Sequence, residues 1–345
     1  MKFIHTADWH LGKLLKEHSM TEDQEWLLNN RFLPLVDEEK PDVILLSGDV
    51  YDRSYPPEEA VELFDRMTEE IVGKRKIPFI IISGNHDSAE RLDYAAGLLA
   101  NQNVYIAGQF RGAPRQIVLN DRFGPVEFTL LPFVRAATVR HYMPEADLPD
   151  YDSAVAAALS ACAPSAERRV LVAHFAGFSY TALGHIHRAQ RVGSDTVRYA
   201  GAPLCYHLDE CGMEKSATLV RLGRRGVDGI DTLPLHPRRA MRHIVGPLAK
   251  LVEHPADTGD YIWATLTDPT PQPDAMAMLR TAYPNAMRLD YRPQGAEILP
   301  ADTAQSVRGK PFASLFEDFF TQMNGRPLTV EEARAVKALR EEASK

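Results

Sequence analysis

The sequence predicts an α/β fold: a sheet buried beneath helices, followed by a smaller α/β or α+β domain and a C-terminal helical pair. Over the first 200 residues, short apolar runs alternate with segments of helical periodicity. Such continuous runs are typical of strands buried on both faces of a sheet. Most of these runs stop at polar residues, and α/β proteins bind their ligands at the carboxyl ends of their strands.

The first predicted strand is KFIHTA, residues 2–7, and it stops at Asp8. A helical segment follows over residues 21–39. Its first residues, Thr21 and Gln24, have the spacing of a capping box, in which each side chain caps a backbone N–H group. These residues therefore mark the expected start of the helix.

Three further elements continue the alternation. The run DVILLSG, residues 42–48, predicts a buried strand that stops at Asp49, and IPFIIISG, residues 77–84, predicts another. Between them, a proline in the first turn and amphipathic spacing predict a helix over residues 56–72. Two more strands are expected at residues 169–174 and 180–187.

The second domain is expected where the pattern changes near Cys205, because shorter runs separated by glycine turns begin there. Its expected strands are residues 216–222, 227–235, 238–246, 261–267 and 286–292, with a helix near residues 274–282. The predicted organisation is a first domain over residues 1–204, a second over 205–295, a linker over 296–310 and helices over 311–345.

Composition excludes several protein classes. The 345 residues are 45% hydrophobic and 25% charged, which excludes a disordered chain. The net charge of −8 argues against unspecific coating of nucleic acid, so any contact with DNA needs a local basic patch. Three cysteines without metal-type spacing, no signal peptide and no membrane-spanning apolar run lead us to expect a cytoplasmic protein.

Five polar motifs follow predicted strands. They are Asp8-Trp9-His10, Gly48-Asp49, Gly84-Asn85-His86-Asp87, His174 and Gly184-His185-Ile186-His187. Each alone has an ordinary interpretation: a helix cap, a turn or a core histidine. His185 and His187 alternate along a predicted strand, which indicates only a shared face. Together, however, the motifs supply the oxygen and imidazole donors that two divalent metal ions require.

In this order the motifs resemble those of the calcineurin-like metallophosphoesterases. The segments MKFIHTADWHLGK, LLSGDVYDRSYPP, ISGNHDSAERL and YTALGHIHRAQ resemble those of one branch, the bacterial SbcD-type nuclease subunits. The resemblance covers the whole chain, most closely residues 1–95 and 170–210. It implies a β-sandwich flanked by helices, with the smaller domain capping the nuclease domain.

The resemblance also implies residue roles. One metal is bound by Asp8, His10 and His187, the other by Asn85, His174 and His185, and Asp49 bridges the two. The expected metals are two Mn²⁺ ions, with Mg²⁺ as an alternative. His86 stabilises the transition state or protonates the leaving oxygen, and Asp87 orients the His86 imidazole.

The interval between His174 and His185 is short for the family. A crossover between parallel strands needs about a dozen residues or more. Either the two strands form an antiparallel hairpin, or part of the connection is missing from this sequence. We favour the second alternative.

Basic residues suggest where DNA binds. Lys13 and Lys16 follow the first motif, and a cluster over residues 214–247 includes Arg221, Arg224, Arg238 and Arg239. These side chains could contact phosphates, or they could form an ordinary solvated face.

An apolar stripe in residues 311–323 has helical spacing. It either packs on its own protein or docks on a partner. In the family such helices bind an SMC-like, SbcC-type ATPase, and the subunit forms a homodimer. Residues 56–72 and 91–101 are the candidates for the dimer interface.

The leading hypothesis is a manganese-dependent DNA nuclease. It would act as a double-strand exonuclease and a single-strand or hairpin endonuclease in DNA repair, recombination and replication, at the nucleoid. A second hypothesis retains the chemistry on a small phosphodiester or phosphomonoester. A third is a DNA-tethering subunit without catalysis, which the complete set of donor residues disfavours.

Overall fold

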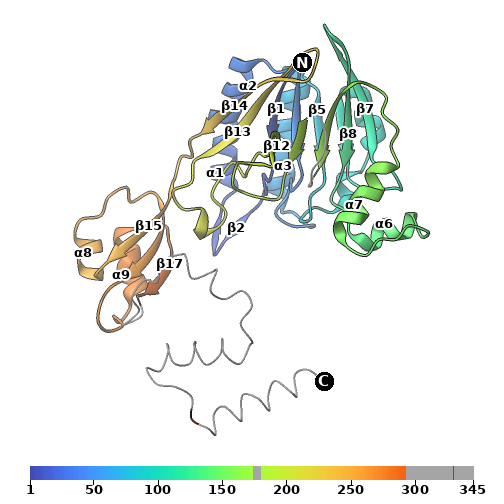
Figure 1. Ribbon diagram of the computed structural model, residues 1–345. Helices are drawn as coiled ribbons and strands as arrows, with labels where there is room; N and C mark the ends of the chain where they lie inside the picture. The colour runs from blue at the N-terminus through green and yellow to red at the C-terminus, as the bar shows by residue number, and fades with distance from the viewer. Residues whose placement is uncertain (174–179, 293–328, 330–345) are drawn as a thin grey trace. The chain divides into compact units, whose positions relative to one another are not determined.

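Two six-stranded sheets form the main body of the molecule (Figure 1). The computed structural model describes residues 1–173, 180–292 and 329. The first sheet has the order β14-β13-β1-β4-β5-β6, and the second has the order β11-β12-β10-β9-β8-β7. The predicted α/β sandwich flanked by helices is confirmed.

Four parallel strands form most of the first sheet, and an antiparallel pair extends one edge. The parallel strands are β1 (Lys2–Thr6), β4 (Val43–Ser47), β5 (Phe79–Ile82) and β6 (Val104–Ala107), and the added pair is β13 (Lys215–Leu222) and β14 (Val227–Leu235). Since parallel strands end at one edge of a sheet, the motifs that follow β1, β4 and β5 lie together.

The second sheet also has a parallel centre, with an antiparallel strand at each edge. Its strands are β7 (Arg115–Asp121), β8 (Gly124–Leu131), β9 (Arg168–Ala173), β10 (Tyr180–Leu183), β11 (Gln190–Val192) and β12 (Ser194–Tyr199). Because β9 and β10 run parallel, the antiparallel-hairpin alternative is wrong. The missing-connection alternative remains a prediction, since residues 174–179 lie outside the described residues.

The core is divided into layers by the two sheets. Phe3 and Leu45 of the first sheet pack against Phe128 and Val170 of the second, and all four are fully buried. Helices cover the outer faces (Figure 1). On the first sheet they are α1 (Thr21–Leu27), α2 (Leu33–Glu39) and α3 (Glu58–Thr68), and on the second α6 (Ala136–Tyr142) and α7 (Tyr151–Ser160).

Short elements complete the main body. They are the hairpin β2 (Leu14–Leu15) and β3 (His18–Ser19), the helices α4 (Ala89–Leu92) and α5 (Ala96–Leu99), the π-helical turns η1 (Leu28–Phe32) and η2 (Glu69–Lys74), and the 3₁₀ turns η3 (Ala100–Gln102) and η4 (Leu208–Glu210). The turn η1 joins α1 to α2, so one continuous helical stretch spans the predicted residues 21–39. The predicted capping box is wrong: Met20 is the N-cap residue and its side chain caps nothing.

A small parallel sheet follows the main body. It contains β15 (Met241–Gly246), β16 (Tyr261–Leu266) and β17 (Ala286–Tyr291), with α8 (Leu248–Glu253) and α9 (Ala275–Ala282) packed on one face. The expected domain boundary at residue 205 is too early, because β13 and β14 hydrogen-bond into the first sheet. Alternating strands carry no information on which sheet they join, so the sequence could not separate these cases.

Residues 1–291 form one compact unit. The predicted linker over residues 296–310 lies outside the described residues, as do the predicted C-terminal helices apart from Thr329. Among the described helices, none combines the length and the apolar character that crossing a bilayer requires.

Candidate metal centre

Two loops of the first sheet supply the most buried donors. Asp8, His10 and Asp49 have exposed fractions of 0%, 1% and 2%. The loops run side by side, because the N–H of Asp8 donates to the Gly48 carbonyl at 3.1 Å and that of His10 to the Asp49 carbonyl at 2.9 Å. The backbone therefore fixes these donors before any side-chain contact is made.

All three donors have left-handed backbone conformations. Their φ angles are +53° for Asp8, +45° for His10 and +48° for Asp49. Non-glycine residues seldom adopt this region, and its cost is tolerated mainly where function fixes the geometry. A side chain at Gly84 would place a Cβ 2.1 Å from Asp49 Oδ1, so only glycine allows the neighbouring loop to approach.

The loop after β5 carries three residues of one motif, and each of them has different surroundings. Asn85 is exposed, and His86 is half-buried with its backbone N–H on Asp49 Oδ1 at 2.9 Å. The buried carboxylate of Asp87 accepts the backbone N–H groups of Val50, Tyr51 and Gly84 at 2.9–3.1 Å. Asp87 therefore ties the loop after β4 to the loop after β5. Burial, with a contribution from Asp49, raises the pKa of Asp87 to about 6.

The predicted role of Asp87 in orienting His86 is wrong. His86 Nδ1 instead donates to the backbone carbonyl of Asp52 at 2.8 Å. A carbonyl oxygen can only accept, so Nδ1 carries the hydrogen and Nε2 is left to act on a ligand. The Asp52 carboxylate accepts from Lys13 Nζ at 2.7 Å. The sequence analysis assigned Asp52 no role.

The second sheet contributes histidines from the loop after β10. The predicted strand over residues 180–187 is too long, since β10 ends at Leu183 and the φ of His185 is +92°. The two histidines therefore do not alternate along a strand. Their positions instead come from contacts: the N–H of His185 donates to Asp8 Oδ1 at 2.7 Å, and its Nδ1 lies 3.0 Å from Asn85 Oδ1.

His187 meets the first sheet directly. Its Nε2 lies 3.0 Å from His10 Nε2, and His10 Nε2 lies 3.6 Å from Asp49 Oδ2. We divide the candidate donors into two groups that follow the roles implied by the resemblance. The inner group is Asp8, His10 and His187, and the outer group is Asn85 and His185. His174, assigned to the outer group by resemblance, lies outside the described residues.

The donor set fits divalent cations. Within the described part of the chain, Asp8 Oδ2 is buried and has no hydrogen-bond partner. Burial and the neighbouring charge of Asp49 raise the pKa of Asp8 well above its ordinary value. A cation would relieve both costs. Two imidazole nitrogens that face each other, with carboxylates alongside, match the mixed oxygen and nitrogen donors that bind divalent metal ions.

Several supporting residues escaped the sequence analysis. Gln24, read as a cap, accepts the N–H of Gly12 at 3.1 Å and donates to the carbonyls of Trp9 and His10 at 3.2 Å and 2.8 Å. Its amide therefore secures the loop that carries His10. No local signal could reveal this role, because glutamine at the start of a helix already has an ordinary explanation.

Glu210 also escaped notice. Its Oε1 accepts His187 Nδ1 at 2.9 Å, and its other oxygen pairs with Lys215. Burial opposes ionisation of Glu210, but the hydrogen bond from His187 and the charge of Lys215 outweigh it, and the pKa of Glu210 is lowered. Glu210 lies 23 residues from His187 in the sequence, and no motif connects them.

The structure places Lys13 beside the site, but it does not gather all of the predicted DNA contacts there. Arg221 lies opposite Lys2, at the start of β1, and Leu222 pairs with Met1. The metal motif follows the other end of β1. Arg221 and the exposed Arg224 beyond it are therefore at the wrong end of the sheet to flank these donors.

Most of the remaining basic residues form ion pairs with acidic residues of this chain. Arg238 pairs with Glu22 at 2.6 Å, and Arg239 pairs with Asp23 at 2.9 Å. Lys13 pairs with Asp52, as described above. Lys16 is exposed in the β2–β3 hairpin. Of the six basic residues predicted to contact DNA, Lys16 and Arg224 are the two that form no ion pair within the described residues.

Comparison with known proteins matches two parts of the chain to family models. Residues 1–188 match the calcineurin-like phosphoesterase model. The chain belongs to the calcineurin-like phosphoesterase family. Residues 237–324 match a second model, SbcD_C, described as the type 5 capsule protein repressor C-terminal domain. The prediction of a metal-dependent phosphodiesterase with an SbcD-type organisation is confirmed.

A curated relative extends the likeness over nearly the whole chain. The SbcD subunit of the nuclease SbcCD from Staphylococcus epidermidis is 27% identical over 377 aligned positions, which cover 98% of each chain. The alignment is longer than this 345-residue chain, so some segments of the relative have no counterpart in this sequence.

Two solved structures are also similar. A dimetal phosphatase from Danio rerio is 11% identical with a TM-score of 0.36, and covers 68% of this chain and 99% of its own. A hypothetical protein from Thermus thermophilus is 12% identical with a TM-score of 0.33, and covers 68% of this chain and 97% of its own.

Proposed function

We propose that this protein is a manganese-dependent DNA nuclease subunit. The observation that carries the proposal is the place of the buried Asp49 carboxylate, which lies against His10 of the inner group and accepts the backbone N–H of His86, the residue after Asn85 of the outer group. The proposal is supported by the similarity of the whole chain to a nuclease subunit. Hydrolysis of a phosphodiester needs positive charge against the phosphate and a donor for the departing oxygen, and this set of residues can hold both.

The inner group would hold one ion, and the outer group with His174 would hold the other. Asp49 would bridge the two ions: its Oδ2 faces His10, and its Oδ1 accepts the N–H of His86, the residue after Asn85. When bound, the two ions supply positive charge beside the phosphate and lower the pKa of water in the site. Manganese is the ion we propose, and magnesium is the alternative.

His86 would act on the leaving oxygen. The hydrogen bond from Nδ1 to the Asp52 carbonyl sets the ring, so that a protonated Nε2 can donate to substrate. The backbone N–H of His86 holds Asp49 in the same loop. His86 is half-buried, so a ligand can reach it.

The proposed substrate is DNA, cut from double-stranded ends and at single-stranded or hairpin structures, at the nucleoid. The name of the relative describes one subunit of a larger nuclease. By the family's pattern, residues 311–345 would bind an SMC-like ATPase in repair, recombination and replication. Co-purification with such an ATPase tests this partner. Removal of residues 311–345 alone should abolish the co-purification.

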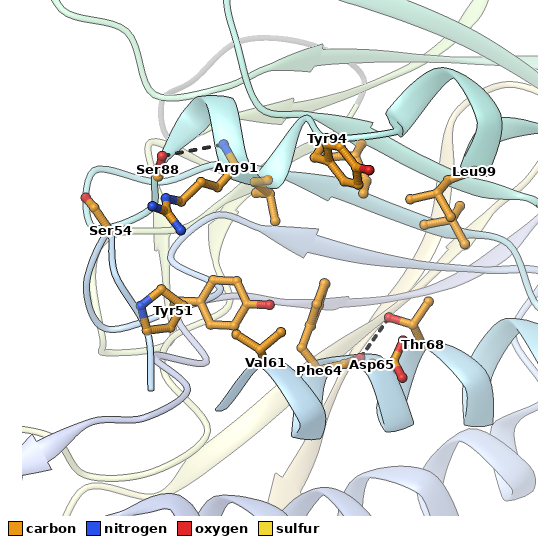
Figure 2. Close-up of a pocket in the computed structure, with 14 residues that line it drawn as sticks. Tyr51, Ser54, Val61, Phe64, Asp65, Thr68, Ser88, Arg91, Tyr94 and Leu99 are labelled. Carbon is orange, nitrogen blue, oxygen red and sulfur yellow. Dashed lines mark hydrogen bonds between the residues drawn. The ribbon is translucent and has the colours of Figure 1, made fainter. Parts of the chain in front are cut away.

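Dimer formation is proposed for the face carried by α3 and α5. A cavity of about 360 Å³ lies there, between Val61 and Phe64 of α3 and Tyr94 and Leu99 opposite (Figure 2). Tyr94 and Leu98 beside it are 82% and 74% exposed. Exposed apolar side chains in such density are typical of an interface. A monomeric mass in sedimentation would contradict a dimer.

The first test is cleavage of labelled linear and hairpin DNA with Mn²⁺, Mg²⁺ or EDTA, beside a small chromogenic phosphodiester. The proposal predicts DNA degradation that needs Mn²⁺ and stops in EDTA. Hydrolysis of the small substrate without DNA cleavage would favour the alternative of a small-molecule phosphodiesterase. If neither substrate is cleaved, the assay is repeated with the ATPase, and continued inactivity would contradict a catalytic role.

A further inference from the structure

A buried ion pair lies behind the inner group. Glu210 and Lys215 each have an exposed fraction of 4%. Glu210 Oε1 accepts His187 Nδ1 at 2.9 Å, while Lys215 Nζ pairs with Glu210 Oε2 and donates to the His187 carbonyl at 3.2 Å. The pair therefore contacts both the ring and the backbone of a single histidine.

These contacts determine which ring nitrogen faces the centre. An ionised carboxylate can only accept, so His187 Nδ1 carries the hydrogen. Its Nε2 then presents a lone pair to the space that it shares with His10 Nε2, 3.0 Å away. Histidine ligands of metals commonly have such a partner on the other nitrogen, which sets the tautomer and the ring orientation.

The position of the pair in the fold makes it a firm support. Glu210 closes the turn η4, and Lys215 is the first residue of β13. Because β13 runs antiparallel to β1, its first residues lie at the end of β1 that leads to Asp8. Lys215 and the inner-group residues Asp8 and His10 are therefore carried by neighbouring strands of the first sheet.

A second interpretation makes His187, His207 and Glu210 a metal site of their own, since their donor atoms lie within 4.8 Å of one another. The ammonium group of Lys215 on the Glu210 carboxylate opposes this, because it already supplies the positive charge that a cation would bring. A buried carboxylate without such a partner would be costly. The pair is therefore a support for His187.

We propose that Glu210, with Lys215 as its counter-ion, is a positioning residue that holds His187 with Nε2 toward the inner metal. The proposal rests on the metal centre of the proposed function. It adds a residue outside the five strand-end motifs and predicts that the two metals respond differently to its loss. Removing the carboxylate should weaken the inner metal and leave the outer metal unchanged.

The test titrates Mn²⁺ by calorimetry into the full-length wild type, Glu210→Ala, and the double variant Glu210→Gln with Lys215→Met. Glu210→Ala should weaken one of two sites by about 10–100-fold. The double variant keeps an amide oxygen for Nδ1 and leaves no buried unpaired charge, so its affinity should stay within a few-fold of wild type. Asp209→Ala removes an exposed carboxylate from the same turn and should change neither site.

The outcomes separate this inference from the proposed function. Two unaltered sites in a folded Glu210→Ala protein would overturn the inference while leaving the metal centre intact. A wild type that binds no Mn²⁺ would contradict the proposed function. The inference then still has its own readout: nitrogen NMR of the metal-free protein should show His187 protonated at Nδ1. Protonation at Nε2 alone would overturn it.

Discussion

The inner and outer groups differ in how the fold holds them. In the inner group, Asp8 and His10 are almost completely buried and are joined to the β4 loop by backbone hydrogen bonds. In the outer group, Asn85 and His185 are exposed and contact each other through their side chains. A buried, braced site loses little entropy when a ligand binds, whereas an open site leaves room for substrate. We infer that the inner group binds its metal more tightly and that substrate approaches from the outer group.

Removing Asp49 should have the largest effect, because this carboxylate is the one proposed to bridge both ions. Asp49→Ala should abolish binding of at least one ion and reduce DNA cleavage by about a thousandfold or more. Metal content after dialysis and the cleavage rate measure the two effects. Full activity with both metals retained would show that the groups are independent of Asp49.

Changing His86 should separate chemistry from metal binding. His86→Ala removes a donor for the leaving oxygen, so cleavage should fall by about 10²–10⁴-fold. Its side chain belongs to neither group, and both ions should therefore remain. A matched loss of metal would show that His86 is a ligand instead.

Gln24 tests how far the support of the inner group extends. Gln24→Leu fills the same space but leaves the Gly12 N–H and the His10 carbonyl without this partner. The free energy of unfolding should fall by about 2–3 kcal/mol, because buried polar groups lose their hydrogen bonds. The inner metal should weaken more than the outer one in a Mn²⁺ titration.

Asn30→Ala is the matched control for Gln24. Asn30 lies in the same helical stretch, and its amide donates to the Trp26 carbonyl at 2.8 Å on the exposed side. It should change stability only slightly and metal binding not at all. Equal effects of the two substitutions would mean that Gln24 acts only through the helix.

The smallest effect is expected from His5, between the sheets and outside both groups. His5 is fully buried against Tyr180, and burial lowers its pKa from 6.5 to about 3. The unfolded chain therefore binds a proton more readily than the folded one. This contribution makes the free energy of unfolding fall as the pH drops from about 6.5 toward 3, by at most about 1.4 kcal/mol per pH unit.

His5→Gln should reduce that slope, because glutamine does not titrate. Denaturant unfolding of the two metal-free proteins at several pH values in this window measures the difference. Identical slopes would show that His5 takes up a proton in the folded state as easily as in the unfolded state.

The sequence predicted the strand-end motifs because their signals are local. An apolar run that stops at Asp8 or Asp49 reports both the strand and the polar residue at its end. The left-handed conformations of Asp8 and His10 carry no such signal, and neither does the parallel pairing of β9 and β10.

The supports of the centre depend on contacts between distant segments. Gln24 and Glu210 belong to no metal motif in the sequence, and only the folded chain brings them to His10 and His187. The same limit explains the basic residues. A count of charges cannot show that Lys13 faces Asp52, or that Arg239 faces Asp23.

The most direct test of the two-group centre is anomalous diffraction from crystals of the protein soaked with Mn²⁺. The account predicts two peaks: a stronger one among Asp8, His10 and His187, and a weaker one beside Asn85 and His185, with Asp49 between them. A single peak, or two peaks that Asp49 does not separate, would contradict it.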